Sequence, residues 1–86
     1  MRTFRKTIIT NHAIYRIKER LKPFFNIDSE ILLLAKAREL LCNSFFVCYS
    51  NNNEIYRYNL ENKNWLKFVY NPNSDILVTV VEVCNE

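Results

Sequence analysis

The sequence contains no glycine and only two prolines, Pro23 and Pro72. Loops that cradle phosphate groups depend on glycine, because its missing Cβ lets backbone N–H groups approach the ligand closely. A phosphate-binding loop is therefore not expected, and zinc-finger spacing, paired acidic metal motifs and a nucleophile elbow are missing as well. Nucleotide hydrolysis and metal catalysis consequently have no support in the sequence. Asparagine tolerates the left-handed backbone region better than most residues with a Cβ, and its clusters around 51–53, 62–64 and 71–73 are expected to form the turns.

Long apolar runs are also missing. The longest run has five residues, as in Ile31 to Ala35, whereas a membrane-spanning helix needs about 20. Residues 1–10 include Arg2, Arg5 and Lys6 but no sustained apolar segment of the kind found in a secretion signal. We therefore expect a cytoplasmic protein without a membrane partner.

Cysteine is scarce, and its number is odd. Cys42, Cys48 and Cys84 show no C-x-x-C spacing, and the single histidine does not complete a zinc site with them. Their neighbours are apolar, which favours reduced thiols packed as small core residues, with a nucleophilic role as the alternative. We expect no metal and no cofactor.

The 86 residues, 49% of them apolar, suffice for one domain over 1–86 with one hydrophobic core.

Charge is distributed unevenly along the chain. Residues 1–25 hold seven basic side chains and one acidic side chain, a net charge of +6, and the other 61 residues carry −3. A basic pole attracts polyanions such as RNA or DNA. The alternative is a set of solvated charges on an exposed helix.

Two helices are predicted in the N-terminal half. Asn11 is expected to cap a helix of about 11 residues that starts at His12 and stops at Pro23, since proline removes a backbone donor. Its apolar residues follow helical spacing at Ala13, Ile14, Ile17 and Leu21. Asp28 or Ser29 is expected to cap a second helix over about 30–42, whose polar side chains Lys36, Arg38 and Glu39 are expected to face solvent.

The C-terminal half consists of short aromatic and β-branched runs between turn residues, at 45–50, 54–60, 65–70 and 76–84. These intervals predict an antiparallel sheet of about four strands, to which residues 2–10 could add an N-terminal edge strand. Helices followed by a sheet define an α+β domain, with the two helices packed on one face of the sheet.

His12, Arg16 and Arg20 recur every four residues, so they form one stripe along the first helix, beside the apolar stripe. Metal-free RNA cleavage needs a group that takes or gives a proton and cations that stabilise the charge developing on the phosphate. Histidine exchanges protons readily near neutral pH, and the two arginines supply the cations. The alternatives are a solvated histidine and a helix-surface ion pair between Arg16 and Glu19.

The segment Ile9-Thr10-Asn11-His12-Ala13, followed by Arg16 and Arg20, resembles the opening I-T-x-H-A-x-x-R-x-x-x-R of a family of small bacterial domains of unknown function. Members of that family resemble RelE-type and colicin-type RNase toxins. Its last strand often places threonine between apolar residues, as in 76–81 here. The resemblance implies the fold of barnase, colicin and RelE, with catalytic positions at His12, Arg16, Arg20 and Thr79 and a further candidate at Arg57. In the family, glycine is common soon after the second arginine, whereas this chain has Lys-Pro-Phe-Phe at 22–25. The loop at this point and the groove that the polar stripe borders are therefore expected to differ from those of the family.

Strand alternation places Tyr56 and Tyr58 on one face and Arg57 on the other. Together with Lys67, these residues offer cations and flat rings, the combination that holds phosphates and stacks unpaired bases. They are predicted to bind substrate, and the alternative is ordinary cross-strand aromatic packing.

Two functions follow from these features. The first is a metal-independent endoribonuclease of toxin type acting on RNA such as tRNA or mRNA, with a cognate antitoxin as a partner. The second is a non-catalytic phage or mobile-element protein that binds a protein or nucleic acid through its basic helix and aromatic sheet. A homodimer formed by pairing of exposed sheet edges is compatible with either function.

Overall fold

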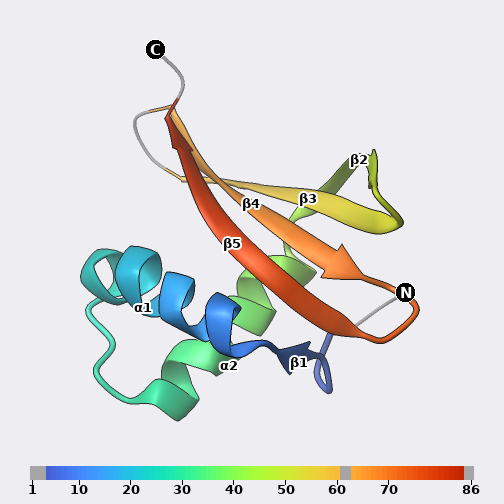
Figure 1. The fold of residues 1–86 in the computed structure, drawn as a ribbon. Coiled ribbons are helices and arrows are strands. Elements are labelled where there is room, and N and C mark those ends of the chain that lie inside the picture. The colour runs from blue at the N-terminus through green and yellow to red at the C-terminus, as the bar shows by residue number, and fades with distance from the viewer. Residues whose placement is uncertain (1–3, 61–62, 85–86) are drawn as a thin grey trace.

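The computed structural model describes residues 4–60 and 63–84, which form a layer of two helices against one five-stranded sheet (Figure 1). The elements in chain order are β1 (Ile8–Ile9), α1 (Asn11–Phe25), α2 (Glu30–Cys42), β2 (Phe45–Ser50), β3 (Asn53–Asn59), β4 (Asn64–Asn71) and β5 (Ile76–Cys84). The predicted α+β class is confirmed, with the helices in the N-terminal half and most of the sheet in the C-terminal half. Within the described residues, neither helix has the length and apolar character needed to cross a membrane.

The ends of α1 differ from the prediction. Thr10, and not Asn11, is the N-cap, because its side-chain oxygen accepts a hydrogen bond from the Ala13 N–H at 3.0 Å. Pro23 lies inside the helix, so the expectation that it stops α1 is wrong. In the last turn, proline interrupts a single hydrogen bond of the helical ladder, and the chain continues helically to Phe25.

Asn26 ends α1 in the left-handed conformation, with φ 54° and ψ 46°. Its N–H donates to the Lys22 carbonyl at 2.8 Å, which satisfies one of the last helical carbonyls. Glycine usually occupies this position, and in a chain without glycine an asparagine replaces it.

The predicted bounds of α2 are confirmed, and Ser29 caps it by accepting from the Leu32 N–H at 3.4 Å. Arg38 is not fully solvent-facing as expected, since its Nε donates to the Thr7 carbonyl at 3.1 Å. This bond ties α2 to the segment that precedes β1.

The sheet has the order β1-β5-β4-β3-β2. Strands β2 to β5 form the predicted antiparallel meander. The predicted N-terminal edge strand is limited to two residues in β1, which pairs in parallel with β5, so the whole sheet is mixed. Arg2 and Thr3, which the prediction included, lie outside the described residues.

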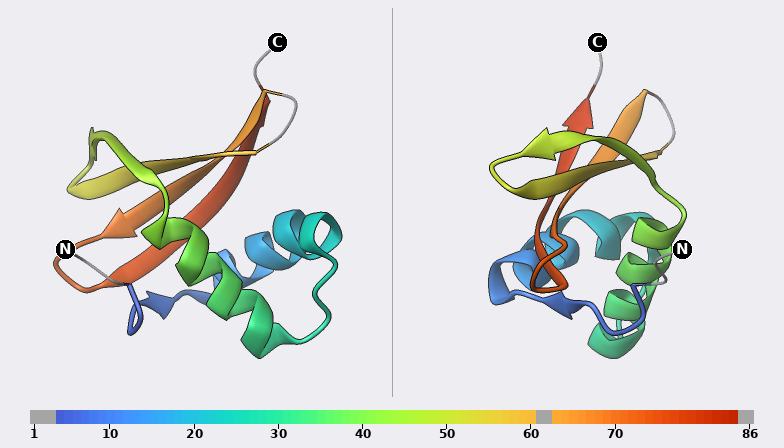
Figure 2. Two further views of the ribbon diagram at one scale, coloured as in Figure 1. Left: turned by 180° about the vertical axis from the view of Figure 1, so that it is seen from behind. Right: turned by 90° about the vertical axis from the view of Figure 1, so that its right-hand side faces the viewer.

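Cross-strand partners show which side chains share a face. Tyr56, Phe68 and Val80 are in register across three strands, and Phe68 and Val80 are fully buried in the core with helix residues. The helices therefore cover this face, as the turned views show (Figure 2). Core side chains of the two helices are Ala13, Ile17, Leu21, Leu33, Ala37, Leu40 and Leu41.

A β-bulge in β2 changes the alternation of its side chains. The register with β3 shifts between Phe46 and Cys48, so Phe46 lies opposite Tyr56 and Tyr49 lies opposite Glu54. Phe46 and Tyr49 consequently share the helix-side face, with ring centroids 4.9 Å apart. Simple alternation would have separated them.

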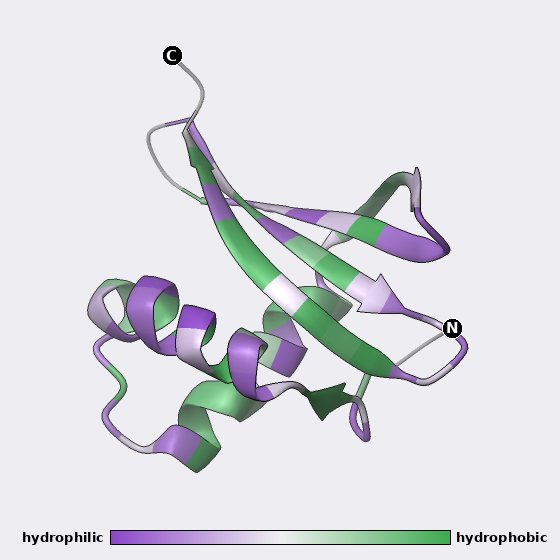
Figure 3. Cartoon of the chain, viewed as in Figure 1, coloured by the Kyte–Doolittle hydropathy of each residue, from purple (hydrophilic) through white to green (hydrophobic). Residues whose placement is uncertain are grey.

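The cysteines with described side chains are not core residues. Cys42, in the last turn of α2, and Cys48, on the edge strand β2, are both exposed and free, so the expectation of burial is wrong for them. The side chain of Cys84 lies outside the described part of the structure. β1 and most of β5 are hydrophobic, whereas hydrophobic and hydrophilic residues alternate around α1 (Figure 3).

Candidate functional site

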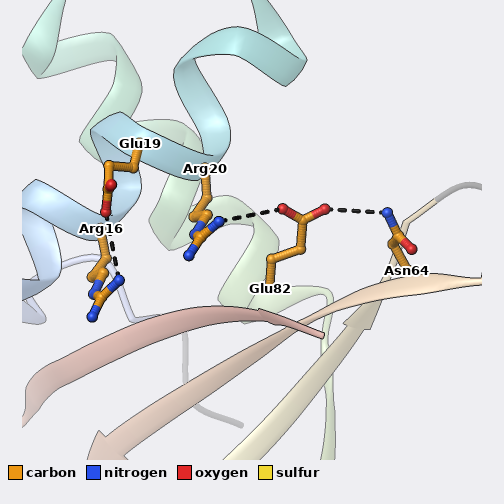
Figure 4. Close-up of polar contacts among 5 residues, drawn as sticks. All are labelled: Arg16, Glu19, Arg20, Asn64 and Glu82. Atoms are coloured by element: carbon orange, nitrogen blue, oxygen red, sulfur yellow. Dashed lines mark hydrogen bonds and ion pairs between the residues drawn. The ribbon is translucent and has the colours of Figure 1, made fainter. Parts of the chain in front are cut away.

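The candidate site lies between α1 and the end of β5. Ala13, Ile17 and Leu21 are fully buried and fix one side of α1 against the sheet. Because of helical periodicity, Arg16 and Arg20 lie on the adjacent side of the helix, one turn apart. Figure 4 shows both arginine side chains extending from α1 toward the sheet.

Arg16 and Arg20 are partly buried, and each has one loose acidic partner. Arg16 Nη1 lies 3.5 Å from Glu19 Oε1 on the same helix, and Arg20 Nη1 lies 4.0 Å from Glu82 Oε1 on β5. Each arginine side chain keeps 37% of its surface exposed. Both distances exceed those of a strong charge-assisted hydrogen bond, about 2.7–2.9 Å, so the guanidinium groups are held without being fully neutralised.

Glu82 connects Arg20 to the end of the sheet. Its Oε2 accepts a hydrogen bond from Asn64 Nδ2 at 3.2 Å, while its Oε1 faces Arg20 (Figure 4). Glu82 is opposite Leu66 in the register, and Leu66 belongs to the buried core. The carboxylate is therefore on the helix side of the sheet, at the edge of the core.

The arginines keep unused hydrogen-bonding capacity. The Nε atoms of Arg16 and Arg20 are buried, and neither has a hydrogen-bond acceptor among the residues that the structure describes. A buried donor without an acceptor costs about 1–3 kcal/mol. An incoming anion could accept from the exposed guanidinium nitrogens of both arginines, which makes this surface suited to phosphate.

His12 is exposed in the first turn of α1. Arg16 is four positions and Arg20 eight positions further along the helix, which correspond to about 6 Å and 12 Å along the axis. His12, Arg16 and Arg20 thus form the predicted stripe, with the imidazole at one end and the Glu82 carboxylate near the other.

Thr79 is not part of this arrangement. It pairs with Val69, which in turn pairs with Ile55, on the strand positions that alternate with the core residues Phe68 and Val80. Because adjacent side chains in a strand point to opposite faces, Thr79 faces away from the helices. The resemblance groups Thr79 with the two arginines. In this structure Thr79 and the arginines lie on opposite sides of the sheet.

The four predicted substrate-binding residues are divided between the two faces. Tyr56 and Tyr58 lie on the helix side, partly buried against the core, and Tyr56 donates its hydroxyl hydrogen to Glu54 at 2.9 Å. Arg57 and Lys67 are cross-strand partners on the open face. The Arg57 guanidinium stacks over the Trp65 ring at 4.5 Å, and its Nε donates to Asn59 Oδ1 at 2.8 Å. One ligand cannot contact all four through a single surface.

Glu82 and Asn64 were missed by reasoning from the sequence. Glu82 carried a usable signal, since it is the only charged residue in the apolar segment 76–84 and shares strand parity with Val80. A charged residue at a core-facing position indicates a buried cation nearby. Asn64 carried none, because its position depends on the register between β4 and β5.

Among the described residues, no group of three or more histidine, cysteine, aspartate or glutamate side chains is arranged to hold a metal ion. Comparisons of the chain with models of protein families, with curated proteins and with solved structures found no match. The resemblance to the H-A-x-x-R domains therefore remains a prediction.

Proposed function

We propose that this protein is a metal-independent endoribonuclease of toxin type, with its site on the α1 stripe. The observation that carries the proposal is the pair of partly exposed side chains of Arg16 and Arg20, each held by one carboxylate among the described residues at 3.5 Å or more. Two such groups one helical turn apart match a phosphodiester, whose nonbridging oxygens accept hydrogen bonds from arginine.

The residues of the stripe have different tasks in this proposal. Arg16 and Arg20 bind the scissile phosphate and stabilise the additional negative charge when the 2′-oxygen attacks phosphorus. His12 transfers a proton, either from the 2′-hydroxyl or to the departing 5′-oxygen. Glu82 is a positioning residue, since it holds Arg20 from the sheet and is itself held by Asn64.

A cleavage assay tests the proposal. RNA and DNA oligonucleotides of the same sequence are incubated with the protein in the presence of EDTA. We expect cleavage of the RNA alone, because the reaction needs a 2′-hydroxyl, and products that end in a 2′,3′-cyclic phosphate. His12→Ala should lower the rate by about 10²–10⁴-fold, and Arg16→Ala by about 10²–10³-fold.

Lys18→Ala is the matched control. Lys18 lies on the same helix and carries the same charge, but its Nζ pairs with Glu30 at 2.8 Å, away from the stripe. This variant should cleave at the rate of the unchanged protein. Cleavage that survives both His12→Ala and Arg16→Ala, or that stops in EDTA, contradicts the proposed site.

A non-catalytic RNA-binding role is the second candidate function. It is favoured by the position of Thr79, which removes a candidate hydroxyl group from the stripe. In that case the RNA remains intact, while its affinity for the protein, measured by fluorescence anisotropy, still falls in Arg16→Ala. The two functions are therefore separated by product analysis.

A further inference from the structure

We infer that β2 is a self-association edge, through which two copies of the chain pair β2 to β2 in antiparallel orientation. This inference is independent of the proposed function. β2 is the last strand in the sheet order and is paired only with β3 among the described strands. The outer edge of such a strand presents backbone N–H and C=O groups that can pair with another strand.

The side chains of β2 are exposed along its whole length. The exposed fractions of the four large apolar residues are 53% for Phe45, 45% for Phe46, 48% for Val47 and 73% for Tyr49. Proteins normally protect an edge strand with lysine, proline or inward-pointing charge. Residues 42–53 contain no charged residue and no proline, and the bulge between Phe46 and Cys48 is the one protective device present.

A second copy fits this edge better than an unrelated strand for two reasons. First, β2 has no charged residue, so two identical strands meet without like-charge repulsion although the chain carries +3. Second, antiparallel pairing of a strand with itself is two-fold symmetric, so the same surface serves both partners.

The other edge of the sheet explains why association stops at two copies. There β1 pairs in parallel with only Ile76 and Leu77 of β5, and α1 packs against β5, so the chain's own elements already occupy part of this edge. A head-to-tail filament would need β2 of one copy to pair with this edge of the next. In the symmetric β2–β2 arrangement, the β2 edge of each copy is occupied by the other copy. No further copy can then add through β2.

The exposed area predicts a weak dimer. Taking about 200 Å² for a whole aromatic side chain, the exposed parts of the three β2 aromatics amount to about 340 Å² in each copy. With Val47 and the backbone, the two copies together bury on the order of 1,000 Å², at the low end for specific interfaces. We therefore expect a dissociation constant in the micromolar range. Hydrogen bonds between the two β2 strands would fix the register of the pair.

Sedimentation equilibrium over a range of about 5–500 μM tests the inference. We expect the average mass of the unchanged chain to rise from 10.4 kDa toward twice that value. Val47→Lys should remain monomeric with an unchanged circular dichroism spectrum, because the side chain is exposed and the substitution places a positive charge on the β2 edge of both copies. Tyr49→Glu is a second variant, placed at the most exposed side chain of the strand.

Ile31→Lys is the control, since Ile31 on α2 is 80% exposed and the substitution adds the same charge. This variant should dimerise like the unchanged chain. The inference is overturned if the unchanged chain stays monomeric throughout the range, if Val47→Lys and Tyr49→Glu still dimerise, or if Ile31→Lys is the variant that prevents association. A monomer that binds an extended peptide along β2 would also overturn it.

Discussion

The Thr10 hydroxyl joins the start of α1 to β5. Its oxygen accepts from the Ala13 N–H at 3.0 Å, and its hydrogen is donated to the Val78 carbonyl at 2.9 Å. The same residue also donates its backbone N–H to the Leu77 carbonyl at 3.3 Å. One side chain therefore sets where the helix begins and how it is attached to the sheet that it covers.

We expect Thr10→Ala to lower the free energy of unfolding by about 2–3 kcal/mol. The lost cap costs about 1–2 kcal/mol, and the Val78 carbonyl loses a partner worth about 1 kcal/mol. Urea titration followed by circular dichroism measures the change. Asn11→Ala is the matched control: Asn11 is exposed and does not cap the helix, so the change should stay within about 0.5 kcal/mol. A larger loss in Asn11→Ala would place the cap at Asn11.

At the scale of elements, Asp75 links the β4–β5 turn to the segment before β1. Its Oδ1 accepts hydrogen bonds from the Thr7 hydroxyl at 2.7 Å and from the Tyr70 hydroxyl at 2.6 Å, and both donors belong to buried residues. Its backbone carbonyl accepts from the Ile8 N–H at 3.0 Å. These bonds hold the short parallel strand β1 against β5.

Asp75→Ala should destabilise the fold by about 3–7 kcal/mol. Two buried hydroxyl groups lose this acceptor, at about 1–3 kcal/mol each, and alanine at φ 54° adds about 1 kcal/mol. Asp75→Asn keeps an oxygen acceptor and tolerates this φ, so its cost should be smaller than that of Asp75→Ala. Thermal unfolding of both variants measures the difference. Equal losses in the two variants would show that the acceptor oxygen is not the cause.

Local patterns predicted most elements. The bounds of α2 and of strands β2 and β5 follow from apolar periodicity, Ser29 and the asparagine turns, all of which act within a few residues. Pro23 and the bulge in β2 could not be predicted this way. Apolar periodicity does not fix how far the helix runs beyond Pro23 to Asn26, and the bulge is visible only in the register between β2 and β3.

The candidate site was only partly predictable for the same reason. His12, Arg16 and Arg20 lie on one helix, so helical spacing alone places them together. Thr79 and Glu82 lie far from them in sequence, and their faces depend on the registers of β5. Parity relative to Val80 separates these two residues and assigns Glu82, not Thr79, to the arginines.

Over the whole molecule, the two proposed surfaces occupy different ends of the sheet. α1 packs mainly on β5, whereas β2 lies three strands away in the sheet order, and the views of Figures 1 and 2 agree on this separation. A dimer formed through β2 would leave both α1 stripes accessible. Each stripe could then contact a separate segment of one polyanion, which raises the effective local concentration of the second site.

The salt dependence of RNA affinity shows whether the stripe, and not the general basic charge, binds the nucleic acid. For single strands, the logarithm of affinity falls with the logarithm of salt concentration by about 0.7 for each phosphate contacted. Arg16→Ala and Arg20→Ala should each reduce this slope by up to about 0.7, because each removes one of the two cations that contact the scissile phosphate. A 2′-O-methyl RNA, which lacks the attacking hydroxyl, allows binding to be measured by fluorescence anisotropy without cleavage.

Lys18→Ala removes the same unit of charge from the same helix, but Lys18 is paired with Glu30 on α2. Its slope should match that of the unchanged chain if phosphates contact the stripe specifically. Equal reductions in all three variants would mean that RNA responds only to net charge, since a diffuse field does not distinguish one cation of α1 from another. The position of the guanidinium groups between α1 and β5 would then have no part in binding.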